Sequence, residues 1–507
     1  MFEVPRTRSE AWKTCLTQIV LSTAAALPRF RGGWPGQLQD IVEHNRSDAL
    51  STQEQCRPPG GASIEFRHFR LIELFSLEEF DLMSAGLRTV FSRPDQYPAP
   101  NHLDEFEDRA DDLHAGGWTV IGTLIRSGEP FYWAGQTRRM PELPEEVDHI
   151  GLTAHKLLPS LVAITADVFL TDKATDRIRN IQEELYLPEV TFRYWNPRRW
   201  PYSHATRLPE YIASEAVLSW IDGLRSRVEM LLRPFFKGQF LSTRDGSRSR
   251  LPVIETYWLV NAPWGSGFPP WKRAAQPWLR SLGFGKTGIN SYEGPERMFS
   301  WSEDGFRVAR LCLPKPDPED RFSTSNLVDA LNGILPAFAV RQLLDSLETD
   351  FAGLRRRMYQ RVMFGARKRL RKEILNAQEL SRSSLVLNRL QVEFKDAKAS
   401  IAYHAKHMSD MVNSLIPNRP AVTLDAALIE GIGWKARIVH QHVKLLTQAF
   451  SEHVSILNMR VMYGLQQKLL WLTVLYTILA FIGVIANWCQ LIDFWDKVAN
   501  RLAHLAV

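Results

Sequence analysis

The chain has 507 residues, of which 45% are hydrophobic and 23% are charged, so it is long enough for two or three globular domains of ordinary composition. The formal net charge of +6 is modest for this length, and it permits an acidic partner without requiring one. Four scattered cysteines, Cys15, Cys56, Cys312 and Cys489, form no CxxC pair. Their spacing argues against a disulfide framework or a zinc site and fits a reducing compartment.

Residues 1–60 have a mixed composition and are predicted to be a helical or irregular segment that ends in the turn-rich "CRPPGGAS". The beginning weakly imitates a secretory signal. However, Glu3 and Glu10 interrupt its basic region, and Thr17 and Gln18 break its apolar part. A first amphipathic helix is therefore favoured over a signal peptide. The large N-terminal part of the chain is accordingly expected in the cytoplasm.

Strand and helix signals alternate over residues 61–315, which predicts an α+β (or mixed α/β) cytosolic domain. The predicted strands are "SIEFRHFRLIELF", "LPSLVAITADVFLT", "PEVTFRYW" and "LPVIETYWLV". The second of them should run into a helix capped by Thr171 or Asp172, and a long amphipathic helix should start at Pro209. Two hairpins are also expected. One joins two strands within "GWTVIGTLIRSGEPFYWAGQT" at 126–129, and the other lies within "MFSWSEDGFRVARLCLP" around 303–305.

Strand signals stop after the Pro-rich and acidic linker "PKPDPEDR" (314–321). Residues 322–420 are predicted to form a helical hairpin or coiled-coil-like region, because apolar positions recur in steps of three and four. These positions are Val340, Leu344, Leu347, Phe351, Leu354 and Met358, followed by Leu390, Phe394, Ala397, Ile401, His404, Met408, Met411 and Leu415.

After the break at "IPNRPAV", a stalk helix is predicted over residues 421–468, starting near Thr423 or Leu424 with Asp425 in its first turn. Its apolar positions are Leu428, Ile432, Val439, Val443, Leu446, Phe450 and Leu457. Since no proline interrupts residues 421–507, one continuous helix is expected to run from the stalk into the final apolar segment.

Residues 469–492 contain no charged side chain, and a helix of this length covers roughly 36 Å, enough to cross a hydrocarbon core of about 30 Å. Apolar residues occur all around the helix, and Trp471 and Trp488 are spaced like interfacial anchors. A single C-terminal transmembrane helix is therefore predicted; the alternative is a buried core helix. The polar residues within it are Thr473, Tyr476, Thr477, Asn487 and Gln490.

The flanks of this segment add two expectations. Arg460 and Lys468 before it balance Lys497 and Arg501 after it, so the positive-inside rule does not decide the orientation. Residues 493–507 form a short amphipathic tail that can lie in a headgroup layer but is too short to span.

The stretch "LNMRVMYGLQQKLLWLTVLYTILAFIGVIANW", placed after an α/β domain and a stalk helix, resembles the layout of the CorA-type divalent-cation transporters. This resemblance implies a homo-oligomer in which five chains form a pore. The family follows its first span with Gly-Met-Asn and a second span. Here the corresponding positions read Ala486-Asn487-Trp488 without a second span, so that only Asn487 can be carried over.

A basic strip in "LRRRMYQRVMFGARKRLRKE" is the most distinctive charged feature. Its members are Arg355, Arg356, Arg357, Arg361, Arg367, Lys368, Arg369, Arg371 and Lys372. On one helix they would form a positive surface for nucleic acid, another acidic ligand or anionic lipid. The alternative is pairing within the chain, with the acidic cluster at 102–114 or with Glu379 and Asp396.

Three further patterns are candidates of lower specificity. "SLGFGKTGIN" ends like a phosphate-binding loop, but Arg280 occupies the place of its first glycine. The acidic run 102–114 offers carboxylates to Mg²⁺ or Ca²⁺, without the spacing of a calcium loop. Two histidine pairs can hold a metal or sense pH if their helices pack: His404, His407, His440 and His442. No catalytic set, metal site or cofactor is predicted from these patterns.

The functional expectation is a single-pass, oligomeric membrane sensor or effector. In this hypothesis a cytosolic domain acts through a helical stalk on a membrane span, with a CorA-like pore or a bilayer-perturbing activity as its output. The alternative is a membrane-tethered enzyme, binding module or scaffold for which the span is only an anchor. Whether the chain is an enzyme is left open.

Overall fold

The computed structural model describes the following residues: 58–91, 102–109, 117–126, 136–184, 189–192, 204–207, 209–241, 251–263, 267, 270–271, 274–282, 291–293, 300–304, 307–315, 323–364, 388–390, 392–406 and 422–505. The chain divides into two compact units, one of residues 1–348 with 389–437 and the other of residues 349–388 with 438–507. The predicted N-terminal helix lies outside the described residues.

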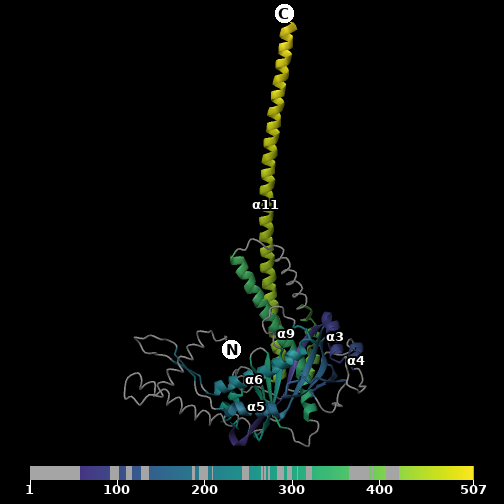
Figure 1. The fold of residues 1–507 in the computed structure, drawn as a ribbon, viewed down its shortest axis with the longest axis vertical. Helices are drawn as coiled ribbons and strands as arrows, with labels where there is room; N and C mark the ends of the chain where they lie inside the picture. Colours follow the sequence, from purple (N-terminus) through teal and green to yellow (C-terminus); the bar gives the residue numbers. More distant parts are fainter. Residues whose placement is uncertain are drawn as a thin grey trace, which may run out of the picture. The chain divides into compact units, whose positions relative to one another are not determined.

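A nine-stranded mixed sheet forms the core of the first unit, in the order β3-β2-β4-β5-β1-β8-β11-β10-β9 (Figure 1). Its strands are β1 (Ser63–Ser76), β2 (Trp118–Ile125), β3 (Gln136–Arg139), β4 (Val147–Leu158), β5 (Leu161–Leu170), β8 (Val253–Val260), β9 (Ser291–Glu293), β10 (Ser300–Asp304) and β11 (Val308–Pro314). A separate pair consists of β6 (Glu189–Phe192) and β7 (His204–Arg207). The mixed α+β architecture expected from the sequence is therefore present.

β1 lies in the middle of this sheet, antiparallel to both β5 and β8. Its sequence begins with alternating apolar and polar residues and continues as a mostly apolar stretch that contains the charged Arg70 and Glu73, and its burial follows the same change. The first half alternates between half-buried and buried side chains, whereas from Phe69 to Phe75 every side chain is buried. Continuous apolar runs are typical of strands that are covered on both faces.

The helices of this unit are α3 (Phe80–Val90), α4 (His102–Arg109), α5 (Asp172–Glu183), α6 (Pro209–Leu232) and α8 (Gln276–Ser281), with short 3-10 turns η1 (Pro59–Gly61) and η2 (Leu77–Glu79). The structure confirms three local predictions. Thr171 is the N-cap of α5, α6 begins at Pro209, and β10 and β11 form the antiparallel hairpin around 303–305.

The described strands do not form the predicted hairpin at 126–129, most of whose turn and second strand (127–135) lies outside the described residues. β2 pairs antiparallel with β4, and its other edge takes β3 in the parallel direction, with Gly122 opposite Gln136. A tight turn can join only antiparallel strands, because parallel strands need a longer connection to bring the chain back. The sequence pattern identified two strands here but carried no information on their relative direction.

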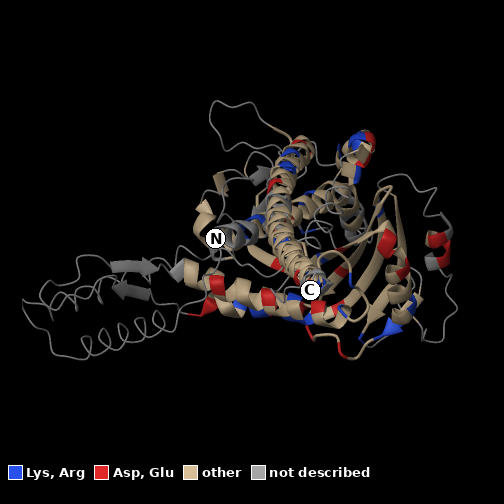
Figure 2. Cartoon of the chain, turned by 90° about the horizontal axis from the view of Figure 1, so that it is seen from above, with Lys and Arg blue, Asp and Glu red and all other residues tan. Residues whose placement is uncertain are grey.

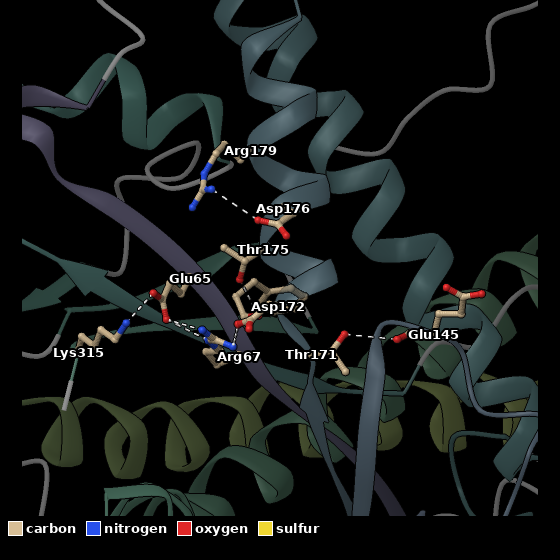
Figure 3. A network of polar contacts seen from close by, with 10 residues as sticks. Glu65, Arg67, Glu145, Thr171, Asp172, Thr175, Asp176, Arg179 and Lys315 are labelled. Carbon is tan, nitrogen blue, oxygen red and sulfur yellow. Dashed lines mark hydrogen bonds and ion pairs between the residues drawn. The ribbon is translucent and has the colours of Figure 1, made fainter. Parts of the chain in front are cut away.

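Polar contacts fasten α5 to the first half of β1 (Figure 3). Glu65 accepts a hydrogen bond from Arg67 Nε at 2.9 Å and another from Lys315 Nζ at 2.9 Å. Arg67 also pairs with Asp172 in the first turn of α5, and the hydroxyl of Thr175 donates to the carbonyl of Phe66. The contacts thus connect the end of β11, the start of β1 and the start of α5.

α9 (Ser323–Phe364) is a helix of 42 residues, and its segment 331–340 is buried on all sides. Such a segment is central to a core, since a surface helix keeps one polar face. Three of the predicted apolar positions on α9 are buried, namely Val340, Leu344 and Phe351. In the second helical stretch, Phe394, Ala397 and Ile401 within residues 392–405 are buried, and so is Leu390 just before it. The connection between these two helical stretches falls outside the described residues.

α11 (Leu424–Leu505) is a continuous helix of 82 residues that begins where the sequence predicted. Its positions Leu428, Ile432, Val439, Val443 and Leu446 are buried, in the predicted steps of four and three. Near the start, Lys435 Nζ lies 2.7 Å from Asp345 Oδ1 and 2.7 Å from Glu348 Oε2, both on α9. These ion pairs join the first turns of α11 to α9 within the first unit.

Candidate functional site

The apolar segment of α11 is the first candidate for a functional site. Within the described residues, one helix is long and apolar enough to cross a membrane, and it covers Met462–Ala499, 38 residues that include the predicted span. Every side chain from Leu465 to Lys497 is exposed. Figure 2 shows α11 almost end-on and tan over most of its visible length, in agreement with the lack of charge between residues 469 and 492.

The residues singled out in the predicted span all lie on this helix. Trp471 and Trp488 are exposed near its two ends. The hydroxyl of Thr473 donates to the carbonyl of Leu469 at 2.9 Å, and that of Thr477 donates to the carbonyl of Thr473 at 2.8 Å. These bonds satisfy the two hydroxyls within the helix, as is common for threonine in apolar helices. Tyr476, Asn487 and Gln490 are exposed on the same helix.

The structure describes the basic strip only in part. Arg355 and Arg356 are exposed on α9, and Arg357 and Arg361 belong to the same helix. The remaining five members, Arg367, Lys368, Arg369, Arg371 and Lys372, lie outside the described residues, as do Glu379 and the glycine-rich residues 283–290. The structure therefore brings four of the nine basic residues onto one helix.

The acidic run and the histidines are not brought together into a metal site among the described residues. Asp104 and Glu107 of α4 lie 2.8 and 2.5 Å from Arg88 Nη2 of α3, so these two carboxylates already face a cation. His404 follows Tyr403 on its helix, His440 and His442 lie on α11, and His407 is outside the described residues.

A buried network of charged and polar side chains crosses the middle of the sheet. Arg70 on β1 lies opposite Asp167 on β5, and its Nε donates to Asp167 Oδ1 at 2.6 Å. The same oxygen is 3.0 Å from His68 Nε2, while His68 Nδ1 is 3.4 Å from the hydroxyl oxygen of Thr256 on β8. None of these four residues is more than 2% exposed.

Electrostatics in this network follow from burial and from the neighbouring cation. Burial alone would raise the pKa of Asp167, but Arg70 and then His68 overcome this effect and hold that pKa well below its usual range. Burial also lowers the pKa of His68, although Asp167 opposes the change. The pKa of the neighbouring His155 is lowered as well, by burial and by the charge of Arg70. The carboxylate is therefore ionised and the two imidazoles are neutral near pH 7.

Thr256, His68 and Asp167 have the order of a hydroxyl, a base and an orienting acid, as in a hydrolytic triad. A nucleophile must reach a substrate, however, and the Thr256 side chain is completely buried. The arrangement in this conformation therefore supports the sheet and not a reaction with a substrate. Sequence analysis missed it because the three residues come from three strands. The available signal was the presence of charged residues inside otherwise apolar strands.

A second buried network lies on the opposite face of the sheet, since Glu255 pairs with Phe69 in register, next to the Arg70–Ile254 pair. Glu255 Oε2 accepts from Arg310 Nε at 2.9 Å and from the hydroxyl of Tyr257 at 2.9 Å. Arg225 of α6 lies 3.4 Å from the other carboxylate oxygen. Burial, and then the charge of Glu255, raises the pKa of Tyr257 well above its usual value.

A third buried group is the carboxyl of Glu73 on β1. It accepts backbone N–H bonds from Leu74 at 3.0 Å, Phe240 at 2.8 Å and Leu241 at 3.0 Å, and so holds the segment after α6 against the sheet. Gly238 is required in this segment, because a Cβ atom there would lie 2.1 Å from the carbonyl oxygen of Leu74. Burial raises the pKa of Glu73 to about 8, although the three N–H groups oppose the change.

Comparison with protein-family models, with curated proteins and with solved structures finds no match to this chain. The function must therefore be argued from the chain's own residues.

Proposed function

We propose that this chain is a single-span membrane protein whose α+β domain is tethered to a bilayer by the C-terminal part of α11. The observation that carries the proposal is the segment Met462–Ala499, a helix with the length and composition of a membrane span and with none of its most apolar stretch buried. A core helix of the same composition would be covered by other elements of its protein, whereas this one exposes its apolar side chains all around.

The continuity of α11 supports a coupling role in this proposal. The helix starts among the ion pairs of Lys435 with Asp345 and Glu348, and it reaches the apolar segment without a break. A continuous helix transmits displacement or rotation along its axis better than a flexible linker does. In the CorA-type layout that the sequence resembles, a stalk helix likewise runs from an α/β domain into the membrane. We therefore assign to the domain the role of a sensor or effector that acts on the bilayer through α11.

The domain is placed on the cytoplasmic side in this proposal. The spacing of the four cysteines fits a reducing compartment, and Cys312 on β11 is buried and forms no disulfide among the described residues. Protease added to intact cells is expected to leave the α+β domain undigested, and it should digest the domain once the cells are permeabilised. Digestion in sealed cells would place the domain outside and would contradict this orientation.

Two lysines in the middle of the apolar segment are expected to release the chain from membranes. In the variant Leu479→Lys/Ile482→Lys, each cation at the centre of a span costs about 2.5–3.5 kcal/mol on insertion scales. The fraction of chain that stays in the membrane pellet after alkaline carbonate extraction should therefore fall several-fold. The matched control is Leu445→Lys/Met459→Lys, which changes two exposed apolar residues of the same helix outside the predicted span and should stay in the pellet.

The wild-type result decides the proposal. If the unaltered chain is extracted into the supernatant as a folded protein, α11 is not a span. In that case its apolar surface is covered by another protein.

A further inference from the structure

The polar residues of the apolar segment share one side of α11. At roughly 100° per residue, Thr473, Tyr476, Thr477, Asn487 and Gln490 fall within an arc of about 140°. Ala480 and Gly483 fall within the same arc. Four aliphatic residues also fall within it, namely Leu469, Leu472, Val484 and Leu491. We call the seven polar and small residues of this arc the polar face. The opposite side carries large apolar residues, namely Trp471, Val474, Leu475, Ile478, Phe481, Ile482, Ile485 and Ile492.

Two amides lie on the polar face, and the one inside the hydrocarbon, Asn487, requires a partner. The Thr473 and Thr477 hydroxyls already donate to carbonyls of their own helix. For the side chains of Asn487 and Gln490, no hydrogen bond is found among the described residues. Hydrocarbon offers neither donors nor acceptors, so that an amide within a span is stable only against another polar group. At about 1.5 Å per residue, Asn487 lies roughly 10 Å from the middle of residues 469–492 and so inside a hydrocarbon core of about 30 Å, whereas Gln490 lies at its edge.

Small residues in the same arc allow a second helix to come close. A Cβ atom added at Gly483 would meet nothing within 4 Å, so the space beside this backbone is open. Helix pairs in membranes favour such positions, because small side chains let two backbones approach and polar side chains bond across the contact.

Among the described residues α11 is the one candidate span, so no second span of the described part of the chain covers this face. An amide both donates and accepts, so Asn487 of one copy is complementary to Asn487 of another when the two helices run parallel. We infer that the polar face is a contact surface for a second copy of this chain, with the two spans parallel in the membrane. The inference rests on the proposed membrane span, and it names a second copy of the chain as the partner of that span.

Cysteine cross-linking in membranes tests this contact. The full-length chain with Cys489→Ser provides the background, and Ala480→Cys on the polar face is compared with Ile478→Cys, which lies at nearly the same depth on the opposite side. Mild oxidation should yield several-fold more disulfide-linked dimer for Ala480→Cys than for Ile478→Cys. Adding Asn487→Leu/Gln490→Leu to the Ala480→Cys variant should reduce the dimer several-fold.

Three results would overturn the inference: equal cross-linking from both sides, no cross-linking above the Cys489→Ser background, or a dimer that the two leucines leave unchanged. Carbonate extraction of the same samples separates this failure from that of the proposed function. Chains that stay in the pellet but do not cross-link refute only the contact. Chains that leave the pellet refute the span.

Discussion

Replacing Asp167 with alanine is expected to lower the free energy of unfolding by about 3–5 kcal/mol, the range for removing one partner of a buried ion pair. The Arg70 guanidinium is completely buried, and its Nε bond to Asp167 is the hydrogen bond that satisfies part of its charge. Its two terminal nitrogens, Nη1 and Nη2, find no hydrogen-bond partner among the described residues. Without the carboxylate, the folded state must keep an uncompensated cation in the middle of the sheet.

Urea unfolding of the full-length protein in detergent, followed by tryptophan fluorescence, measures this change. Asp148→Ala is the matched control, because Asp148 also pairs with a histidine, His149 at 2.8 Å, but its side chain is 63% exposed. That variant should shift the free energy by less than about 1 kcal/mol. Combining Asp167→Leu with Arg70→Met should recover part of the loss, since neither charge of this buried pair remains. Equal effects of Asp167→Ala and Asp148→Ala would contradict this account.

Glu73→Gln is expected to become progressively more stable than wild type as the pH rises from about 5 to about 8. The pKa of Glu73 is raised from 4.5 to about 8 in the folded chain, so between these values the folded state binds one proton that the unfolded state has released. Stability therefore falls with rising pH in this window and changes no further above it. At 1.36 kcal/mol per pKa unit, the upper bound of this loss is about 5 kcal/mol.

The test measures the free energy of unfolding of Glu73→Gln and of wild type at several pH values. Their difference isolates the titration of Glu73 from that of the other groups. Glutamine cannot ionise, and its one acceptor oxygen can keep the N–H bonds of Leu74 and Phe240, which both go to Oε1. The Leu241 bond to Oε2 is lost, which adds an offset that does not depend on pH. The control is Glu78→Gln, on the exposed 3-10 turn that follows β1, which removes a carboxylate without touching the buried one. Its free energy of unfolding, plotted against pH, should run parallel to that of wild type. A stability difference between Glu73→Gln and wild type that does not change with pH would refute the elevated pKa.

Local features of this fold were predictable from the sequence. The N-cap Thr171, Pro209 at the start of α6 and the beginning of α11 at Leu424 each depend on a few consecutive residues. The apolar segment of α11 was predictable for the same reason, since it is a matter of composition along one stretch. Such signals are read directly from neighbouring residues.

Strand direction and the buried networks were not predictable, because they depend on residues that are distant in the chain. Arg70 meets Asp167 97 residues later, and Glu73 meets Phe240 167 residues later. The sequence shows charged residues inside apolar strands but does not say which cation meets which carboxylate. The parallel pairing of β2 and β3 is undetermined for the same reason. The basic strip at 355–372 stays a prediction, because half of it lies outside the described residues.

The central position of β1 has a consequence for biosynthesis. The strand is complete at Ser76, but its neighbour β8 begins only at Val253, about 180 residues later. At 5–20 residues per second, a ribosome needs roughly 10–40 s to make the intervening chain. During this time the central strand of the sheet has an open edge, which is a ready template for pairing with another nascent chain. Chaperone protection of this interval should therefore limit the yield of folded protein more than the final stability does.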